Sequence, residues 1–238
     1  MKTIFYKANT RGHANHGWLN TYHTFSFADY CDSERVHFGA LRVLNDDIVT
    51  GGTGFGPHPH DNMEIVTIPL KGAVRHGDNL GNSGVIHEGD IQVMSAGTGI
   101  VHSEYNADNT TPVNFFQIWI FPDKKDVKPR YEQKQMDYLR HRNSFTELVA
   151  PTPSPNTLWL HQRAWLSIGA FDCDKECVYN IKAPNNAVFA MNIQGKINIG
   201  GIDTDTRDGL GLWETSSVAI KALSDDARIL IIDIPLSW

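Results

Sequence analysis

The sequence predicts an all-β protein with two domains, each a barrel or sandwich of short strands. Its apolar segments are short and rich in β-branched and aromatic residues, and clusters of Gly, Asn, Asp and Pro separate them. The 238 residues include 20 glycines and 11 prolines, which favours many turns. Strand-like segments occur on both sides of a proline-rich stretch at 151–156, which is typical of an extended connector.

In the first half, short apolar runs predict strands at 38–44, 64–70, 91–95 and 113–121. We expect turns between them, including one at Asn45-Asp46-Asp47, because these residue types favour turns. The segment 113–121 is almost continuously apolar, as in a strand buried on both faces. Its polar exception is Gln117, which either points into the barrel and shapes a pocket or hydrogen-bonds a buried backbone group.

The middle of the chain differs from both halves. Residues 131–141 are polar with weak helical spacing and predict a short helix before the connector. Strands are expected again at 158–171, 177–182, 187–194, 196–202, 217–222 and 228–235. The predicted organisation is an N-terminal domain at 1–130, a linker with a short helix at 131–156, and a C-terminal domain at 157–238.

Composition limits the function classes. The net charge of −6 and the pI near 6.0 argue against direct binding of nucleic acid. No apolar run reaches the length of a membrane span or resembles a signal peptide at the start of the chain. Three cysteines, an odd and low number, are typical of a reduced protein. We therefore expect a cytoplasmic protein without a membrane contact.

Histidines and carboxylates form a candidate metal site. His58 and His60 are two residues apart, so a strand would direct both side chains to one face. His102 and Glu104 repeat this spacing 42 residues later, and Glu64 lies at an even spacing from His60. Imidazole and carboxylate ligands with open positions are typical of non-haem iron sites that handle dioxygen, and no cysteine lies nearby for a structural zinc site.

Five candidates exceed what a catalytic site with open positions needs. One glutamate is therefore expected to orient a histidine or act as a base, and strand spacing does not choose between Glu64 and Glu104. A His-x-His pair also arises by chance in β-proteins, and His102 alone would more often be a surface residue. Glycines flanking both motifs favour the site, because they allow tight turns beside ligand-bearing strands. His76, at a turn, is either a pocket residue or a simple turn histidine.

The two motifs are similar to those of the cupin superfamily, whose members are small jelly-roll barrels. Ser95 stands where cupins often have proline, and one extra residue separates Gly97 from His102. This departure resembles the pirin family, which is matched by the run Met-Ser-Ala-Gly-Thr-Gly-Ile-Val-His-Ser-Glu at 94–104. Further matches lie at 25–30, 38–47 and 89–92. The resemblance covers about the first 120 residues, and the remainder matches only in its two-domain layout.

The resemblance implies two tandem jelly-roll barrels packed face to face, with metal in the N-terminal barrel only. The ligands it implies are His58, His60, His102 and Glu104, with Glu64 outside the set of direct ligands. The metal it implies is Fe2+, while related cupins accept Ni2+, Cu2+, Mn2+ or Zn2+.

Resemblance to short bacterial pirin-like proteins implies an oxidoreductase, a metal-dependent dioxygenase that cleaves flavonols such as quercetin with O2. Glu104 is then the candidate base for the substrate hydroxyl. The alternative is a non-enzymatic, metal- or redox-dependent regulator with a protein partner, either a transcription factor or a metabolic enzyme. A third interpretation is a storage or structural cupin that holds zinc. An enclosed cavity would favour the enzyme, and an exposed patch the regulator.

Overall fold

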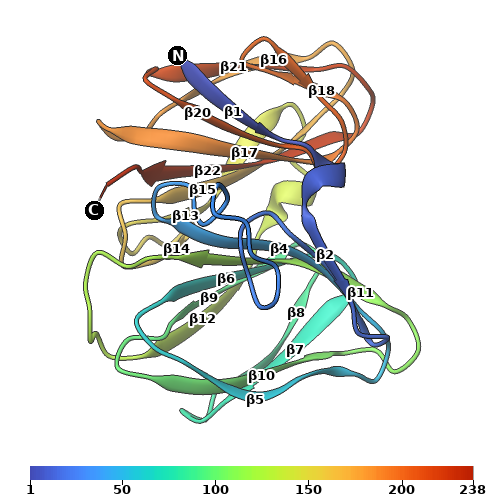
Figure 1. Cartoon of the computed structure of the whole chain (residues 1–238), viewed down its shortest axis with the longest axis vertical. Coiled ribbons are helices and arrows are strands. Elements are labelled where there is room, and N and C mark those ends of the chain that lie inside the picture. Colours follow the sequence, from blue (N-terminus) through green and yellow to red (C-terminus); the bar gives the residue numbers. More distant parts are fainter. Residues whose placement is uncertain (238) are drawn as a thin grey trace.

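The computed structural model describes residues 1–237 and is almost entirely β-structure. Four sheets form two barrels, stacked one above the other in Figure 1. Each barrel pairs a seven-stranded sheet with a four-stranded sheet, and nearly all neighbouring strands are antiparallel. The predicted fold class of two β-barrels is confirmed.

The first barrel contains the histidine motifs. Its seven-stranded sheet has the order β12 (Arg130–Gln135), β9 (Asp90–Ser95), β6 (Glu64–Lys71), β11 (Val113–Ile120), β4 (Leu41–Val49), β3 (Leu19–His23) and β2 (Gly12–Asn15). Its four-stranded sheet has the order β5 (Gly54–His60), β10 (Ile100–Asn106), β7 (Ala73–Asp78) and β8 (Ser83–His87).

The second barrel repeats this architecture. Its larger sheet has the order β1 (Lys2–Tyr6), β20 (Gly209–Trp213), β17 (Asn186–Gln194), β22 (Ala227–Pro235), β15 (Trp165–Phe171), β13 (Ser144–Ala150) and β14 (Leu158–Trp159). Its smaller sheet has the order β16 (Glu176–Asn180), β21 (Ser217–Ala222), β18 (Ile197–Ile199) and β19 (Ile202–Thr204). Two 3₁₀ turns, η1 (Ala8–Thr10) and η2 (Asp137–Leu139), complete the elements of the described residues.

The two larger sheets pack against each other, as Figure 1 shows at the centre of the molecule. One buried apolar cluster includes Phe116 and Ile118 of the first barrel together with Phe189 and Ile232 of the second. Burying large side chains from both sheets supplies the hydrophobic free energy that holds the barrels together. The face-to-face packing expected from the resemblance is confirmed.

The two barrel interiors differ. Inside the second barrel, buried apolar side chains such as Val188, Leu210 and Ile229 form a continuous core. Inside the first barrel, two smaller apolar clusters form around Phe115 and Met94. Polar side chains, including Gln117 and Glu104, are also buried there. The interior of the first barrel is therefore the candidate location of a functional site.

The short helix expected within 131–141 is wrong. Residues Arg130–Gln135 form β12, which pairs with β9, and only the η2 turn follows it. Tyr131 stacks on His76, and Gln133 Nε2 donates to the Val85 carbonyl at 2.7 Å. Backbone pairing with the open edge of β9 and these side-chain contacts outweigh a weak helical propensity.

The turn expected at Asn45-Asp46-Asp47 is also wrong, because these residues lie inside β4. Asp46 meets Arg207 on one side of the strand, at 2.8 Å, while Asn45 and Asp47 line the interior of the barrel. Polar residues are stable within this strand because each has a partner or faces a cavity.

Two strands join sheets that the linear order did not suggest. The first strand of the chain, β1, pairs with β20 in the second barrel, where it appears blue among orange and red strands in Figure 1. Conversely, β12 lies within the expected linker but belongs to the first barrel. We propose domain boundaries at residues 130 and 156, with β1 assigned to the second barrel and β12 to the first.

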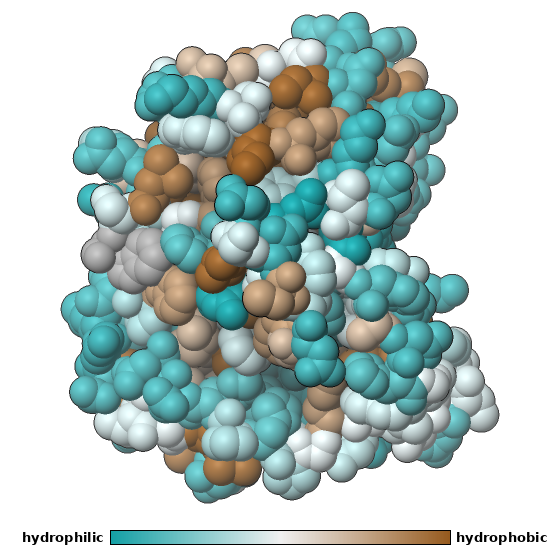
Figure 2. All heavy atoms as spheres, viewed as in Figure 1, coloured by the Kyte–Doolittle hydropathy of each residue, from teal (hydrophilic) through white to brown (hydrophobic). Residues whose placement is uncertain are grey.

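The face seen in Figure 2 is mostly hydrophilic, and its apolar side chains occur in small separate groups. Among the described residues, no helix is long and apolar enough to cross a membrane.

Candidate metal centre

Three histidines gather on two neighbouring strands of the smaller sheet. His58 and His60 lie on β5, and His102 lies on the antiparallel strand β10, directly opposite His58. Their ligand nitrogens all lie within 4.8 Å of one another. Alternation along each strand directs all three rings to the same side, as the sequence spacing predicts. The two motifs are adjacent strands of one sheet rather than strands of facing sheets.

The state of the ring nitrogens fits metal ligands. His102 is 1% exposed, and neither of its ring nitrogens has a hydrogen-bond partner among residues 1–237. His58 Nδ1 hydrogen-bonds the Gly56 carbonyl at 2.8 Å, which leaves Nε2 for a ligand. Buried nitrogens without a partner are costly, and a divalent ion would satisfy them. The three histidines thus form a site suited to a divalent metal ion.

Electrostatics favour the ligand form of these histidines. Burial lowers the pKa of His60 to about 4, and the neighbouring His58 adds to this effect. Burial lowers the pKa of His102 to about 2, and His58 and His60 lower it further. Both rings are therefore neutral near pH 7, which is the form that binds metal.

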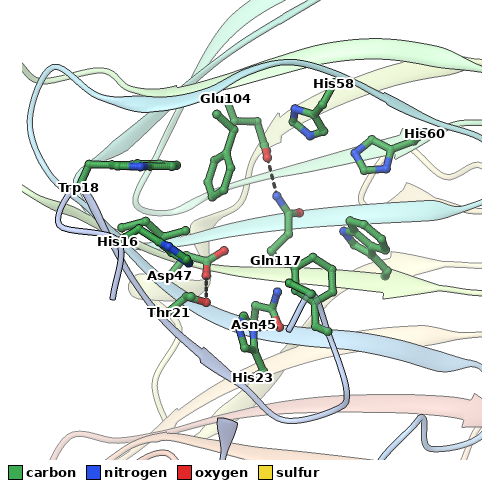
Figure 3. A pocket seen from close by; sticks show the side chains of 15 residues that line it. His16, Trp18, Thr21, His23, Asn45, Asp47, His58, His60, Glu104 and Gln117 are labelled. Carbon is green, nitrogen blue, oxygen red and sulfur yellow. Dashed lines mark hydrogen bonds between the residues drawn. The ribbon is translucent and has the colours of Figure 1, made fainter. Parts of the chain in front are cut away.

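Glu104 lies at the next inward position of β10 and is buried. Its Oε1 accepts a hydrogen bond from Thr67 Oγ1 at 3.1 Å, and its Oε2 accepts one from Gln117 Nε2 at 2.6 Å (Figure 3). Burial raises the pKa of Glu104 to about 7. Its oxygens are not part of the close group that the three histidines form. Glu104 is therefore a carboxyl group beside the histidines that is held by two side-chain donors.

The glycine-containing turn before β10 fixes the relative position of the two motifs. Gly97 has a φ of +49°, and a Cβ at this position would lie 2.0 Å from the Val127 carbonyl oxygen. Only glycine fits such a close approach with a left-handed backbone. The Gly97 carbonyl accepts from the Asn62 amide at 2.9 Å, and the Ala96 amide donates to the Met63 carbonyl at 2.8 Å. The turn after His60 is thereby tied to the turn before His102.

His58 and His60 open into a cavity of about 430 Å³ inside the first barrel (Figure 3). This volume is within the range of small-molecule pockets, about 300–1,000 Å³. Aromatic pairs form much of the wall: Trp18 meets Phe55 edge-on, and Phe27 meets Trp119 edge-on. The lining residues are His16, Trp18, Leu19, Thr21, His23, Phe27, Ala28, Asn45, Asp47, Phe55, His58, His60, Glu104, Gln117 and Trp119.

Two of the side chains expected near the metal lie close to the histidines. Gln117 lines the cavity and, besides binding Glu104, has its Oε1 3.2 Å from Thr67 Oγ1, whose single hydrogen can go to either Glu104 or Gln117. The ring of His76 lies 5.4 Å from that of His102, stacks on Tyr131 and hydrogen-bonds Asp78 through Nε2. His76 thus packs against His102 rather than lining the cavity.

Glu64 lies elsewhere. The chain turns at 61–63, so His60 ends β5 and Glu64 begins β6 in the other sheet of the barrel. The even spacing from His60 therefore does not predict which way the Glu64 side chain points. Glu64 Oε2 accepts from Ser95 Oγ at 2.7 Å, and the carboxylate also accepts from the His161 backbone amide. Glu64 does not line the cavity, and its carboxylate instead accepts hydrogen bonds near the junction of the two barrels.

Sequence reasoning missed the polar side of the cavity. Asp47, Thr21, Asn45 and His23 line it, and His23 Nδ1 hydrogen-bonds Asn45 Oδ1 at 2.9 Å. The cause was the assignment of 45–47 to a turn. The available signal was the apolar context on both sides, since Leu41–Leu44 and Ile48-Val49 continue as one strand through the polar residues.

Comparisons with known proteins agree with this geometry. The family model described as Pirin matches residues 5–120, and the model described as Quercetinase C-terminal cupin domain matches residues 148–234. A quercetin 2,3-dioxygenase of Escherichia coli K12 is 43% identical over 229 residues, 96% of this chain and 97% of that protein. A pirin-like protein of Caulobacter vibrioides is 36% identical over 223 residues, 93% and 95% of the two chains.

A solved structure shows the same architecture with a metal bound. The crystal structure of the bacterial pirin YhhW from Escherichia coli in complex with nickel(II) superimposes with a TM-score of 0.92. The two proteins are 41% identical, and the match covers 98% of this chain and 99% of the other. With both of its domains matched, and relatives of this identity along almost its whole length, the chain belongs to the pirin family.

Proposed function

We propose that this protein is a metal-dependent dioxygenase that cleaves flavonols such as quercetin with O2. One observation carries the proposal: three histidines converge, and two of them, His58 and His60, line a cavity with aromatic walls together with the buried carboxyl group of Glu104. Relatives named quercetin 2,3-dioxygenase support the substrate class. A flat aromatic substrate matches a cavity lined by Trp18, Phe27, Phe55 and Trp119.

His58, His60 and His102 would hold the ion, with Glu104 as the fourth ligand implied by the family resemblance. We propose Fe2+ as the metal, with nickel as the alternative that a related crystal structure supports. A bound divalent ion would supply Lewis-acid chemistry, lowering the pKa of a flavonol hydroxyl that coordinates it.

Glu104, once it leaves the metal, would be the base that removes the proton of that hydroxyl. A pKa of about 7 suits a general base near neutral pH. Gln117 donates to Oε2, so the arriving proton is best placed on Oε1, which Thr67 contacts. The Thr67 hydroxyl lies within hydrogen-bond distance of both Glu104 Oε1 and Gln117 Oε1. When Oε1 takes the proton, Thr67 accepts from it and turns its own hydrogen to Gln117.

The walls of the cavity orient the substrate and limit water. The ring of Trp119 lies 4.9 Å from that of His60 and crosses it at 84°, so it holds this histidine from the side. The Trp18 and Phe55 pair covers another part of the wall. Apolar walls strengthen the interactions of Glu104 with its partners by lowering the local dielectric constant.

The decisive experiment is anaerobic reconstitution with Fe2+ or Ni2+, followed by O2 consumption and quercetin loss with and without each metal. We expect quercetin-dependent O2 uptake in the metal-loaded protein only. At matched metal content, Glu104→Gln should lower turnover by about 100-fold or more. The exposed Glu34→Gln is the control. Unchanged turnover in Glu104→Gln would remove Glu104 as the base, and no uptake with any metal would refute the proposed activity.

A cavity beside the histidines favours an enzyme over the regulatory alternative, for which we expected an exposed patch. A protein partner and the cytoplasmic location stay predictions.

A further inference from the structure

The cavity has a second polar region, on the sheet opposite the metal site. Asp47 on β4 and Thr21 on β3 lie on the seven-stranded sheet, whereas His58 and His60 lie on the four-stranded sheet. Figure 3 shows Asp47 and Thr21 on one side of the cavity and the two histidines on the other, with Gln117 between them. A ligand bound at the metal would therefore have a polar group of the protein facing its other end.

Asp47 is 4% exposed, and only one of its carboxylate oxygens is occupied by the protein. Oδ1 accepts a hydrogen bond from Thr21 Oγ1 at 2.5 Å. In the described chain no hydrogen bond reaches Oδ2, which is turned away from Thr21 in Figure 3. Asp47 therefore presents an acceptor to the cavity without a partner from the protein.

A purely structural role does not explain this carboxylate. The neighbouring Asp46, on the opposite face of β4, is contacted by Arg11, Arg207 and Asn114. Among residues 1–237, no cation forms an ion pair with Asp47, whose bonded partner is a neutral hydroxyl. Burial raises the pKa of Asp47 to about 7, so the fold bears a cost for this group. An apolar residue would pack there at lower cost, which indicates that Asp47 serves a ligand.

Taking the proposed function as its basis, we infer that Asp47 recognises the substrate. It accepts a hydrogen bond from a phenolic hydroxyl on the part of the flavonol that lies away from the metal-binding hydroxyl. Thr21 is a positioning residue that fixes the Asp47 carboxylate. The aromatic walls between the two polar regions would hold the flat rings of the ligand. The cavity thereby selects polyhydroxylated flavonols over those with bare rings.

The test compares two ligands that bind metal in the same way. Quercetin carries phenolic hydroxyls on both ring systems, whereas 3-hydroxyflavone keeps only the metal-binding hydroxyl and carbonyl. Dissociation constants are measured without O2 on nickel-loaded protein, by quenching of tryptophan fluorescence, because Trp18 and Trp119 line the cavity. We expect the wild type to prefer quercetin by about 10- to 100-fold, the range of a hydrogen bond to a charged group.

Asp47→Asn should reduce this preference to about 2-fold while leaving the affinity for 3-hydroxyflavone unchanged, because only the charge-assisted bond is lost. Asp46→Asn is the matched control, since it makes the same chemical change on the other face of β4, and it should keep the wild-type preference. Thr21→Val should weaken the preference and Thr21→Ser should retain it. If Asp47→Asn does not fold, the Thr21 pair decides.

The inference is wrong if Asp47→Asn keeps the wild-type preference, or if the wild type binds both flavonols equally or neither. O2 consumption is measured on the same proteins and separates the two proposals. Ligand preference that depends on Asp47, without turnover, would refute the dioxygenase and keep the recognition role. Turnover by proteins whose ligand preference does not depend on Asp47 would support the dioxygenase and refute the recognition role.

Discussion

Gln117 Nε2 donates a hydrogen bond to Glu104 Oε2 at 2.6 Å, linking β11 of the seven-stranded sheet to the four-stranded sheet that carries the three histidines. The Oε1 of the same amide lies 3.2 Å from Thr67 Oγ1, which can donate to it when its hydrogen is not on Glu104. A donor of this kind stabilises the ionised carboxylate and lowers the pKa of Glu104, against burial that raises it. Gln117 therefore tunes the group that we propose as the base.

Replacing Gln117 with Leu should move the pH dependence of catalysis. Without the donor, the pKa of Glu104 rises above its value of about 7. The acidic limb of kcat/KM should shift to higher pH by about half to one unit, because a base works only when deprotonated. The measurement is a pH–rate profile at matched metal content. Gln162→Leu removes a buried amide that bonds Phe121 outside the cavity and is the control. An unmoved limb would mean that Glu104 does not set it.

Replacing one histidine at a time should distinguish the metal ligands from a histidine that only packs against them. His102→Ala deletes the most buried of the three converging rings, so bound nickel should fall from about one ion per chain to near zero. His76→Gln should retain most of the metal, since His76 only packs behind His102. Elemental analysis after dialysis measures both. Metal retained by His102→Ala at the wild-type level would contradict the three-histidine centre.

The sequence was sufficient to predict the direction of side chains that alternate along a single strand. His58, His60 and His102 follow the period of two, and each points inward in the structure. The same rule failed for Glu64, because the chain leaves one sheet and enters another between His60 and Glu64. A turn of three residues resets which face a side chain occupies, and no local pattern reveals it.

Partners distant in the chain explain the other errors. Asp46 is stable inside β4 because Arg11 and Asn114 contact it and because Arg207 reaches it from the second barrel, 161 residues away. β12 forms because β9 has an open edge, and β1 leaves the first barrel to pair with β20. Each outcome depends on a contact between segments distant in the sequence, which local patterns do not reveal.

Glu64 should make stability depend on pH. Burial raises its pKa from 4.5 to about 7, so the folded state favours the protonated form. Its contribution to stability is fully present below pH 4.5 and is lost as the pH rises to about 7. When the pH is raised from 4.5 to 8, the free energy of unfolding of Glu64→Gln should therefore fall by roughly 3 kcal/mol less than that of the wild type.

Chemical denaturation at both pH values measures this difference. Asp47 and Glu104 have pKa values raised in the same direction, so the wild type should still lose stability as the pH rises, and only the Glu64 share disappears in the variant. Glu34→Gln, at an exposed position, should leave the pH dependence as it is. Parallel pH dependences of Glu64→Gln and the wild type would show that Glu64 is ionised at no cost to the fold.

Arg207 should contribute to the association of the two barrels. Its Nε donates to Asp46 Oδ2 at 2.8 Å, its Nη2 donates to Asn114 Oδ1 at 3.0 Å, and its guanidinium lies over the ring of Phe116. The side chains of Arg207 and Asp46 are 20% and 7% exposed, so solvent screens the pair only weakly. Arg207→Gln leaves Asp46 buried with Arg11 as its remaining cation and should lower the free energy of unfolding by about 2 kcal/mol. Lys2→Gln breaks the exposed pair with Glu214 and should change it by less than about 1 kcal/mol. Equal losses in the two variants, measured by denaturant unfolding at pH 7, would mean that the contact between the barrels depends on their apolar faces alone.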